Sequence, residues 1–436
     1  MSRNKKLIPE LRFPEFKNDG DWKEKALETL ANRIVLKNKN GRIRKVFTNS
    51  AAFGIVDQRK YFDKDIANKS NLENYYVVKD GDYIYNPRIS SEAPVGPTSK
   101  NKTSSTGVMS PLYTVFRFLS NENQFYEYYF ISKHWYDAIR KVSNTGARFD
   151  RMSITDSIFM SIPVLYPEPK EQQKISSCLS SLDEVIEAHS QKLELLKNHK
   201  KGLIQNLFPQ EGEKVPKFRF PEFEKDKEWV EKSFEEVYDF KVTNSFSRAL
   251  LNYEKGIVKN IHYGDIHTKF KTLFDLEKED VPFINPDISI ENIDEENYCL
   301  VGDIVFADAS EDVNDIGKSI ELTNLNNQRL LAGLHTLLAR QKQSDLSIGF
   351  GGYLFKSDWI RKQIQKEAQG AKVLGISKTR INNISISFPK NKKEQQKIAS
   401  CLSALDELIA AEANKIEQLQ QHKKGLMQGL FPKIEN

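Results

Sequence analysis

The chain has 436 residues, which is more than one ordinary hydrophobic core organises, so we expect two domains. Charged residues make up 29% and hydrophobic residues 39%, a composition that excludes an intrinsically disordered chain. No apolar run approaches the ~20 residues of a membrane span, and the basic N-terminus lacks an apolar segment, so we expect no membrane anchor and no secretory signal. The three cysteines, Cys178, Cys299 and Cys401, form no CxxC pair, which argues against a disulfide framework and a zinc site. A cytoplasmic protein is the simplest interpretation.

The formal net charge of +5 is unevenly distributed. Residues 1–169 carry an excess of Lys and Arg, whereas residues 210–390 carry an excess of Asp and Glu. A basic first half suits a polyanionic partner. Because the second half is acidic, charge alone does not predict such a partner.

Each half of the chain opens with the same short motif. RFPEF occurs at 12–16 and again at 219–223, and a tryptophan follows each copy at the same distance, Trp22 and Trp229. The order of segments is entry motif, variable block and long repeat, and this order then recurs. The chain is therefore predicted to be a tandem duplication.

The two variable blocks show short β-rich runs that are separated by turn signals. NYYVVKDGDYIYNP (74–87) in the first block corresponds to NYCLVGDIVFAD (297–308) in the second, and SPLYTVFRF (110–118) corresponds to AGLHTLLAR (332–340). A small-residue loop and a final strand close each block. These patterns predict two divergent copies of one mixed α/β domain that share a core and differ in their loops.

Each block leads into a long repeat, KEQQKISSCLSSLDEVI at 170–186 and KEQQKIASCLSALDELI at 393–409. The apolar residues recur at alternating spacings of four and three, which predicts helices with a coiled-coil seam. The first seam comprises Ile175, Leu179, Leu182, Ile186, His189, Leu193, Leu196, Lys200, Leu203 and Leu207. The second comprises Ile398, Leu402, Leu405, Ile409, Glu412, Ile416, Leu419, Lys423, Leu426 and Leu430.

The two helices are expected to pair antiparallel, because this places the two blocks at opposite ends of a rod about 55 Å long. The FP dipeptides at 208–209 and 431–432 are expected to end the helices. Polar seam residues such as His189, Glu412, Lys200 and Lys423 can fix the register of the pair. They can equally lie at the rim of the seam and reach into solvent.

One scaffold that carries two different sets of loops is typical of a two-headed reader, and the loops hold residues suited to nucleic acid. A basic loop is more often a solvated surface than a DNA contact, so the duplication carries more weight than the loops do. In the first block the candidates for DNA contact are Arg42, Arg44, Lys45, Arg88, Lys102, Arg148 and Arg151. In the second block they are Lys259, His262, Tyr263, Lys269, Ser310, Arg329, His335 and Lys372.

Motifs for catalysis are missing from the sequence. NPRI at 86–89 lacks the second proline and the aromatic residue of an adenine-methyltransferase motif, and GKS at 317–319 lacks the first glycine of a P-loop. HYGDIH at 262–267 is not a metalloprotease motif, and GFGGY at 349–353 lacks dinucleotide-binding spacing. We therefore expect no catalytic residue and no metal site, and interpret the chain as a non-catalytic protein.

The paired RFPEF entries and the paired segments of the form EQQKI…LD…HKKGL…LFP resemble the DNA specificity subunit of type I restriction–modification systems, over essentially the whole chain. The resemblance implies an α+β fold in which two mixed α/β target recognition domains are joined by two long antiparallel coiled-coil helices, related by an internal pseudo-twofold repeat. Its segments would be recognition domain 1 (1–169), a first conserved helical spacer (170–209), recognition domain 2 (210–390) and a second spacer (391–436).

The resemblance also implies a function. Each recognition domain would bind one half of an asymmetric, bipartite double-stranded DNA target, and the helices would set the spacer between the halves. Two methylation subunits would dock on the chain, bring S-adenosylmethionine and methylate adenine at N6. Restriction subunits would add translocation that depends on ATP and Mg. No cofactor is expected in this chain.

Two other interpretations remain at this point. The chain could be a coiled-coil scaffold whose two heads bind protein or carbohydrate, and steep salt dependence of DNA binding would argue against that. It could also be a self-sufficient nuclease or methyltransferase, although the missing cofactor motifs argue against methylation.

Overall fold

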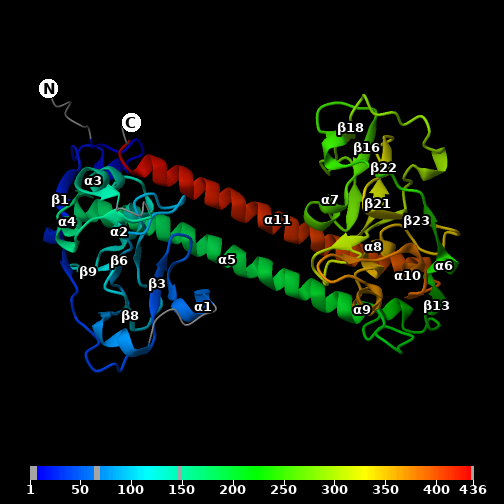
Figure 1. The fold of residues 1–436 in the computed structure, drawn as a ribbon, viewed down its shortest axis with the longest axis horizontal. Helices are drawn as coiled ribbons and strands as arrows, with labels where there is room; N and C mark the ends of the chain where they lie inside the picture. Colours follow the sequence, from blue (N-terminus) through cyan, green and yellow to red (C-terminus); the bar gives the residue numbers. More distant parts are fainter. Residues whose placement is uncertain (1–6, 63–68, 146–149, 434–436) are drawn as a thin grey trace. The chain divides into compact units, whose positions relative to one another are not determined.

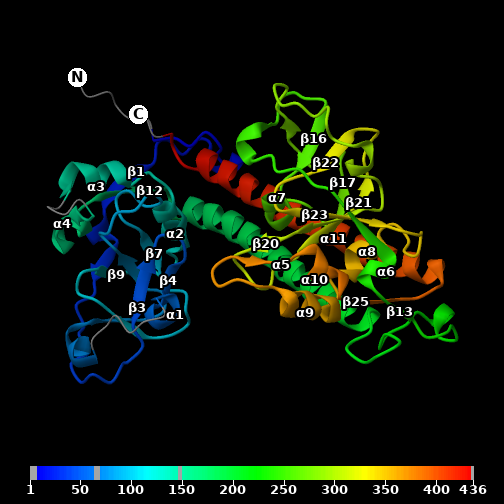
Figure 2. The same cartoon turned by 45° about the vertical axis from the view of Figure 1, so that its right-hand side comes forward.

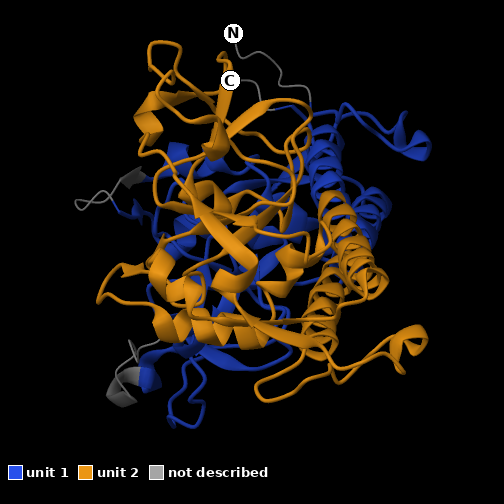
Figure 3. Ribbon diagram, turned by 90° about the vertical axis from the view of Figure 1, so that its right-hand side faces the viewer, with its two compact units in different colours: residues 1–188, 415–436 blue, residues 189–414 orange. Residues whose placement is uncertain are grey.

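The computed structural model describes residues 7–62, 69–145 and 150–433. The chain forms two compact units, which Figure 3 distinguishes by colour. Unit 1 comprises Met1–Ala188 and Lys415–Asn436, and unit 2 comprises His189–Asn414. Each unit therefore contains one variable block and a part of each long helix.

Unit 1 is built on a four-stranded sheet with the order β2-β9-β6-β7, and β1 pairs antiparallel with β12 beside it. Its strands are β1 (Lys23–Ala26), β2 (Ala31–Arg33), β3 (Phe47–Ser50), β4 (Gly54–Asp57), β5 (Tyr76–Val78), β6 (Tyr83–Tyr85), β7 (Thr98–Lys100), β8 (Gly107–Met109), β9 (Thr114–Phe118), β10 (Asn144–Thr145), β11 (Met152–Ser153) and β12 (Pro163–Tyr166). Its shorter helices are α1 (Gln58–Phe62), α2 (Gln124–Ile131), α3 (Tyr136–Val142) and α4 (Asp156–Met160).

Unit 2 repeats this plan with the order β14-β23-β19-β21-β17, and β13 pairs with β25. Its strands are β13 (Val230–Ser233), β14 (Tyr238–Lys241), β15 (Leu251–Asn252), β16 (Val258–Ile261), β17 (Leu273–Asp275), β18 (Phe283–Ile284), β19 (Ile304–Ala307), β20 (Ala309–Ser310), β21 (Ser319–Asn324), β22 (Arg329–Ala332), β23 (Thr336–Gln341), β24 (Leu374–Gly375) and β25 (Ser385–Phe388). Its shorter helices are α6 (Phe234–Val237), α7 (Tyr263–Thr268), α8 (Phe350–Leu354), α9 (Asp358–Glu367) and α10 (Lys378–Asn382).

The central strand of each sheet is buried on both faces. In unit 1, Tyr83 and Tyr85 of β6 point into one hydrophobic cluster and Ile84 points into another, and β19 alternates in the same way. An added sheet, β15-β18-β16-β22, distinguishes unit 2, and it lies beside the main sheet in Figure 1 and in Figure 2. The predicted divergent copies of one mixed α/β core are therefore present.

The structure corrects one detail of the sequence alignment between the two sheets. Arg117 of β9 binds Asp82 through two hydrogen bonds, and Arg340 of β23 binds Asp303 in the same way. Arg117 therefore corresponds to Arg340, one residue out of step with the alignment of 110–118 on 332–340. The cause is that the sequence alignment matched the threonines at the strand starts, whereas strand pairing fixes the register further along.

The two long repeats form uninterrupted helices, α5 (Pro169–Leu207) and α11 (Lys392–Leu430), drawn in green and red in Figure 1. None of the predicted seam positions is exposed, and several are fully buried at the two ends of each helix, as at Ile175 and Ile398. In the middle of the helices the seam side chains, such as Leu193 and Leu196, are only half-buried. The heptad prediction is confirmed, and the apolar packing is tightest where the helices enter the unit cores.

The entry motif binds the start of the long helix in both units. In unit 1 the Arg12 guanidinium makes two hydrogen bonds of 2.8 Å to the Glu171 carboxylate, and the two side chains are only 6% and 1% exposed. In unit 2 Arg219 binds Glu394 through bonds of 2.8 and 2.7 Å. In unit 1, the hydrogen bond to Glu171 also raises the pKa of the Arg12 guanidinium. The RFPEF and EQQKI motifs recur together because each copy of one binds a copy of the other.

The end of each helix closes the core of a unit through an aromatic triad. Phe431 follows α11 and packs in unit 1 against Trp22 and Phe125, with ring centroids 6.0 and 5.5 Å away. In unit 2, Phe208 after α5 packs against Trp229 and Phe350 at 6.1 and 5.7 Å. The tryptophan that follows the entry motif is therefore the receptor for the LFP sequence that ends a long repeat.

Polar bridges fix the register of the helix pair within each unit. In unit 2, His189 contacts Glu412 and Lys200 contacts Asp406, so residue numbers rise along α5 as they fall along α11 and the helices run antiparallel. In unit 1, Lys423 contacts Asp183. The polar seam residues are therefore paired across the seam, as expected if they fix the register.

These bridges follow the internal repeat. Asp183 corresponds to Asp406 and Lys200 to Lys423, since equivalent residues are 223 apart, so the same carboxylate–ammonium contact occurs twice with the helices exchanged. Each aspartate also accepts a hydrogen bond from a tyrosine of the block, Tyr128 at 2.9 Å or Tyr353 at 2.8 Å. The helix pair is thereby tied to the α/β core in each unit.

The first testable prediction concerns the entry-motif pair. Replacing Arg12 with Met should destabilise unit 1 by about 3–5 kcal/mol, because it leaves the Glu171 carboxylate buried and unpaired. Chemical denaturation followed by tryptophan fluorescence measures the effect.

Adding Glu171→Gln to the Arg12→Met variant should recover part of this loss. Lys433→Met removes a cation from an exposed pair with Glu10 and should leave the transition unchanged. Equal behaviour of the Arg12 and Lys433 variants would contradict the structural role of the buried pair.

Candidate nucleic-acid interface

In unit 1 two of the predicted contact residues meet where the central strand ends. Arg88 lies in the loop after β6 and pairs across an isolated β-bridge with Arg151. The backbone N–H of Ile89 donates to Asp150, and that of Met152 donates to Pro87. Both arginine side chains are at the surface, so two cations from distant parts of the sequence are presented side by side.

A hollow of about 470 Å³ lies beside Arg88. Its walls include the amide side chains of Asn49 and Asn86 and the phenol of Tyr113, which precedes β9. Exposed aromatic side chains continue this surface, as Phe53 is 70% and Tyr61 43% exposed with ring centroids 6.1 Å apart. The surface thus combines guanidinium donors and aromatic rings, which contact base edges and thymine methyl groups, whereas the amides of Asn49 and Asn86 already donate to backbone carbonyls.

The remaining candidates of unit 1 lie elsewhere. Arg42 and Arg44 are exposed on the loop before β3, and the Lys45 ammonium donates to Ser105 at 2.8 Å. Lys102 makes an ion pair with Glu127 of α2 at the far end of the sheet strand β7. Arg148 lies outside the described residues.

In unit 2 the equivalent loops meet at the end of β19. Asp308 follows this strand, and its backbone N–H donates to the carbonyl of His335 while its own carbonyl accepts from Ile376. The His335 ring also contacts the Asp308 carboxylate, with Nδ1 3.2 Å from Oδ1. Tyr263 of α7 packs edge-on against His335 at 5.3 Å. Three of the predicted loops therefore contribute to one surface.

An open hollow of about 640 Å³ adjoins this group. It is lined by Asp308, His335 and the exposed residues of the segment around β24, including Val373. Burial raises the pKa of Asp308, and the neighbouring His335 opposes that shift. This carboxylate is thus a partly buried acceptor at the edge of an accessible hollow.

The turn before β23 has a strained and tightly fitted backbone. His335 has a φ of 54°, in the left-handed region that costs a non-glycine residue about 1 kcal/mol or more. At Gly333 a Cβ atom would lie 2.3 Å from the Asn260 amide and 2.6 Å from the Ile261 carbonyl oxygen. The turn is therefore held in one conformation, with His335 51% exposed at its tip.

The other two histidines of this surface are structural. His262 accepts a hydrogen bond from Gly264 at the start of α7, and burial together with the neighbouring Arg248 lowers its pKa. His267 bonds the carbonyl of Ala309 through Nε2 at 2.9 Å. His262 caps the start of α7 and His267 bonds α7 to β20, so both residues position Tyr263.

The remaining candidates of unit 2 are engaged in local contacts. Arg329 pairs with Glu295 and stacks on Tyr298, and Lys269 bonds Tyr253 at 2.9 Å. Lys259 lies over the ring of Phe283, and Ser310 is buried with its hydroxyl donated to the Asp312 carbonyl. Lys372 is exposed near β24.

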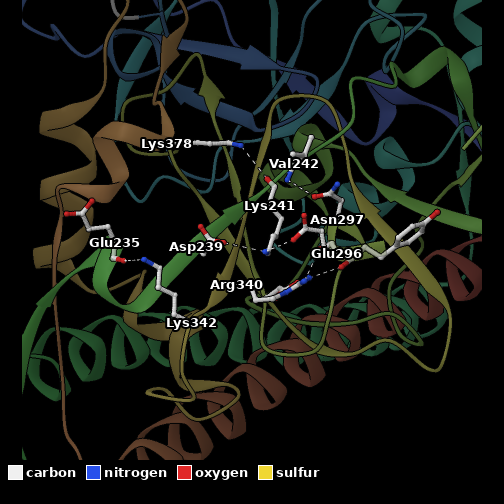
Figure 4. A network of polar contacts seen from close by, with 11 residues as sticks. Glu235, Asp239, Lys241, Val242, Glu296, Asn297, Arg340, Lys342 and Lys378 are labelled. Atoms are coloured by element: carbon white, nitrogen blue, oxygen red, sulfur yellow. Dashed lines mark hydrogen bonds and ion pairs between the residues drawn. The ribbon is translucent and has the colours of Figure 1, made fainter. Parts of the chain in front are cut away.

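Several cationic side chains near β14 and β23 also make hydrogen bonds or ion pairs within unit 2, as Figure 4 shows. Lys241 pairs with Asp239 and Glu296, and the Glu296 carboxylate raises its pKa. Lys378 donates to the Lys241 carbonyl at 3.4 Å, and Arg340 donates to the Glu296 carbonyl at 2.8 Å. These residues stabilise the sheet edge, which leaves the loops after β19 as the accessible surface.

The candidates chosen from the sequence, most of them basic, did not include Asp308, Tyr61 or Phe53, which the structure places at these two surfaces. The position of Asp308 directly after the central strand was the available signal. Within the described residues no group of three metal-ligating side chains is found, and no helix of that part is long and apolar enough to cross a membrane.

The comparison with protein families decides what this two-fold arrangement is. The model of the type I restriction modification DNA specificity domain matches residues 20–198 and again residues 226–421. The chain belongs to the type I restriction–modification DNA specificity family. Each match begins after one copy of the RFPEF motif and covers one variable block and most of the long helix that follows it.

Two curated relatives come from Methanocaldococcus jannaschii. The type I restriction enzyme MjaVIII specificity subunit is 26% identical over 281 residues, covering 63% of this chain and 62% of the relative. The putative type I restriction enzyme MjaX specificity subunit is 24% identical over 282 residues, covering 64% and 60%. The chain thus spans about three fifths of the length of these relatives.

Solved structures confirm the fold. The crystal structure of the type I restriction–modification system S subunit from M. genitalium matches with a TM-score of 0.52 and 13% identity over 98% of this chain and all of that one. A chain from a study of complex assembly and conformational transition of the type I system matches with a TM-score of 0.54 over 94% of this chain and 97% of that chain, again at 13% identity. The expected α+β architecture with two recognition domains and long antiparallel helices is confirmed.

A prediction follows for the fitted turn. Gly333→Ala should destabilise unit 2 by about 1–3 kcal/mol, because the added methyl group displaces backbone that has no room to move. Gly202→Ala is the control, since its Cβ would point into open space on α5 and should stabilise the helix by roughly 0.5–1 kcal/mol. Thermal unfolding measures both, and a neutral Gly333→Ala would show that the turn is adaptable.

Proposed function

We propose that this chain is the sequence-specific DNA-binding subunit of a type I restriction–modification complex and reads an asymmetric, bipartite DNA target. One observation carries the proposal. The same scaffold occurs twice, and in the loop after the central strand one copy presents Arg88 and the other Asp308. Two readers of different chemistry on one framework fit a target with two different halves.

The helices support a role in spacing the two halves. Each has 39 residues and is about 58 Å long at the α-helical rise per residue. Their register is fixed by paired charges, such as Lys200 with Asp406. A pair of helices that does not slip holds a constant length, which is what a fixed spacer between two half-sites requires.

The partners in this proposal are double-stranded DNA, two methylation subunits, and restriction subunits in the full complex. The methylation subunits would carry S-adenosylmethionine and modify adenine at N6, and the restriction subunits would supply ATP- and Mg-dependent cleavage. This chain would contribute no catalytic residue and no cofactor. The proposed compartment is the cytoplasm, where these partners and the DNA meet.

A prediction for the first half-site concerns Arg88. Arg88→Ala should weaken discrimination at one base pair of the first half-site by about 1–3 kcal/mol, because an arginine fork reads guanine through two hydrogen bonds. Fluorescence anisotropy of the assembled complex with variant duplexes measures the change.

Arg140→Ala, which removes a surface cation from α3, is the control and should leave discrimination intact. An equal loss of affinity for both half-sites would contradict the role of Arg88. A wild-type complex without DNA affinity, whose interactions with other ligands do not change with salt, would favour the scaffold interpretation.

A prediction for the helix pair concerns Leu196. Leu196→Asp should disrupt helix packing and prevent assembly with the methylation subunit, because a carboxylate replaces a seam side chain. The adjacent Leu195 is 69% exposed, so Leu195→Asp should leave thermal unfolding unchanged. Wild-type stability and unimpaired complex formation of the Leu196 variant would contradict the seam.

A further inference from the structure

The reading surface of unit 2 presents a carboxylate where a DNA-binding loop usually presents a cation. Asp308 is the first residue after β19, and its side chain is 28% exposed at the edge of the open hollow. The residues that follow, Glu311 and Asp312, are also acidic and exposed. A carboxylate repels DNA phosphates, although Lys378 and Arg380 also line the hollow, so a phosphate contact by Asp308 itself does not explain its position.

Asp308 is held more firmly than a surface carboxylate usually is. Both of its backbone polar groups are bonded, the N–H to the His335 carbonyl at 3.0 Å and the carbonyl to the Ile376 N–H at 2.9 Å. Its Oδ1 atom lies 3.2 Å from the His335 ring, and that ring packs against Tyr263. The acceptor is therefore fixed in direction before any ligand binds, as selective recognition requires.

The chemistry of the bases limits which bases such a hydrogen-bond acceptor can bind. An ionised carboxylate only accepts hydrogen bonds. In the major groove the donors are the exocyclic amino groups, N4 of cytosine and N6 of adenine, whereas guanine O6 and thymine O4 are acceptors. A fixed carboxylate opposite either oxygen would leave two acceptors facing each other without a proton, which penalises the wrong base.

We propose that Asp308 is a specificity-determining residue that accepts a hydrogen bond from the exocyclic amino group of a cytosine or an adenine in the second half-site. His335 is a positioning residue that directs the carboxylate. The inference rests on the proposed function and deepens it, because it assigns a base with an amino donor to the half-site that unit 2 binds. Unit 1 presents Arg88 in the corresponding loop, and this side chain offers hydrogen-bond donors to a base instead.

The test begins with the motif that the wild-type complex recognises. Each cytosine of the second half-site is replaced in turn with 2-pyrimidinone, and each adenine that is not methylated is replaced with purine, because both analogues lack only the amino group. Anisotropy with the assembled complex should show one position at which the analogue weakens binding about tenfold. The analogue that gives the loss identifies the base as cytosine or adenine.

Asp308→Ala supplies the second arm, because it removes the acceptor whereas asparagine would keep a carbonyl oxygen. This variant should bind the natural duplex about tenfold more weakly and should lose no further affinity with the analogue at that position. Asp287→Ala removes an exposed carboxylate elsewhere in unit 2 and should behave as the wild type. His335→Asn, which tolerates the left-handed backbone, should lose discrimination at the same position only.

Two results would overturn the inference. One is a wild-type complex that is indifferent to the amino group at every position of the second half-site. The other is an Asp308→Ala effect that adds fully to the analogue effect. Unchanged affinity of the variants for the first half-site serves as the folding control. A complex that recognises no bipartite motif would instead overturn the proposed function, so the two failures are distinguishable.

Discussion

The buried ion pair between the entry motif and the helix start is the interaction on which the rest of the structure depends. Arg12 with Glu171, and Arg219 with Glu394, join the beginning of each block to the beginning of the helix that follows it. A block of more than 140 residues is thereby closed at its base, as both its ends meet at one point. Because the pair is buried and bidentate, neither partner can change alone without a large cost. This constraint explains why the motifs recur unchanged while the loops between them differ.

The closed base leaves the opposite side of each block free to diverge. In both units the loop after the central strand, the turn before the next strand and the segment before the last strand meet there, although the residues differ completely. The cores beneath are fixed by alternating burial on β6 and β19 and by the Asp82–Arg117 and Asp303–Arg340 pairs. In the proposed function, this separation of a repeated framework from differing loops would allow new specificity without a change of fold.

The sequence predicted the framework better than the reading surface. Helices, seams and the duplication follow from periodicity and repetition, and these signals are local. The partners of the repeated motifs, such as Arg12 with Glu171, are 159 residues apart, so no local pattern pairs them. Of the basic candidates, Arg88 and Arg151 lie side by side at the surface, whereas Arg329 and Lys102 pair with neighbouring carboxylates. Their role in DNA contact stays a prediction. Whether a charged side chain is already paired within the protein depends on tertiary contacts, and a sequence pattern does not show these.

The central claim is that one chain holds two readers of different specificity on a fixed framework. Long-read methylation mapping of DNA from cells that express this chain with its companion methylation subunit tests it most directly. The account predicts a split, asymmetric motif with a spacer of constant length and N6-methyladenine in each half. A single continuous motif, a palindromic one, or no new methylation from an assembled complex would contradict it.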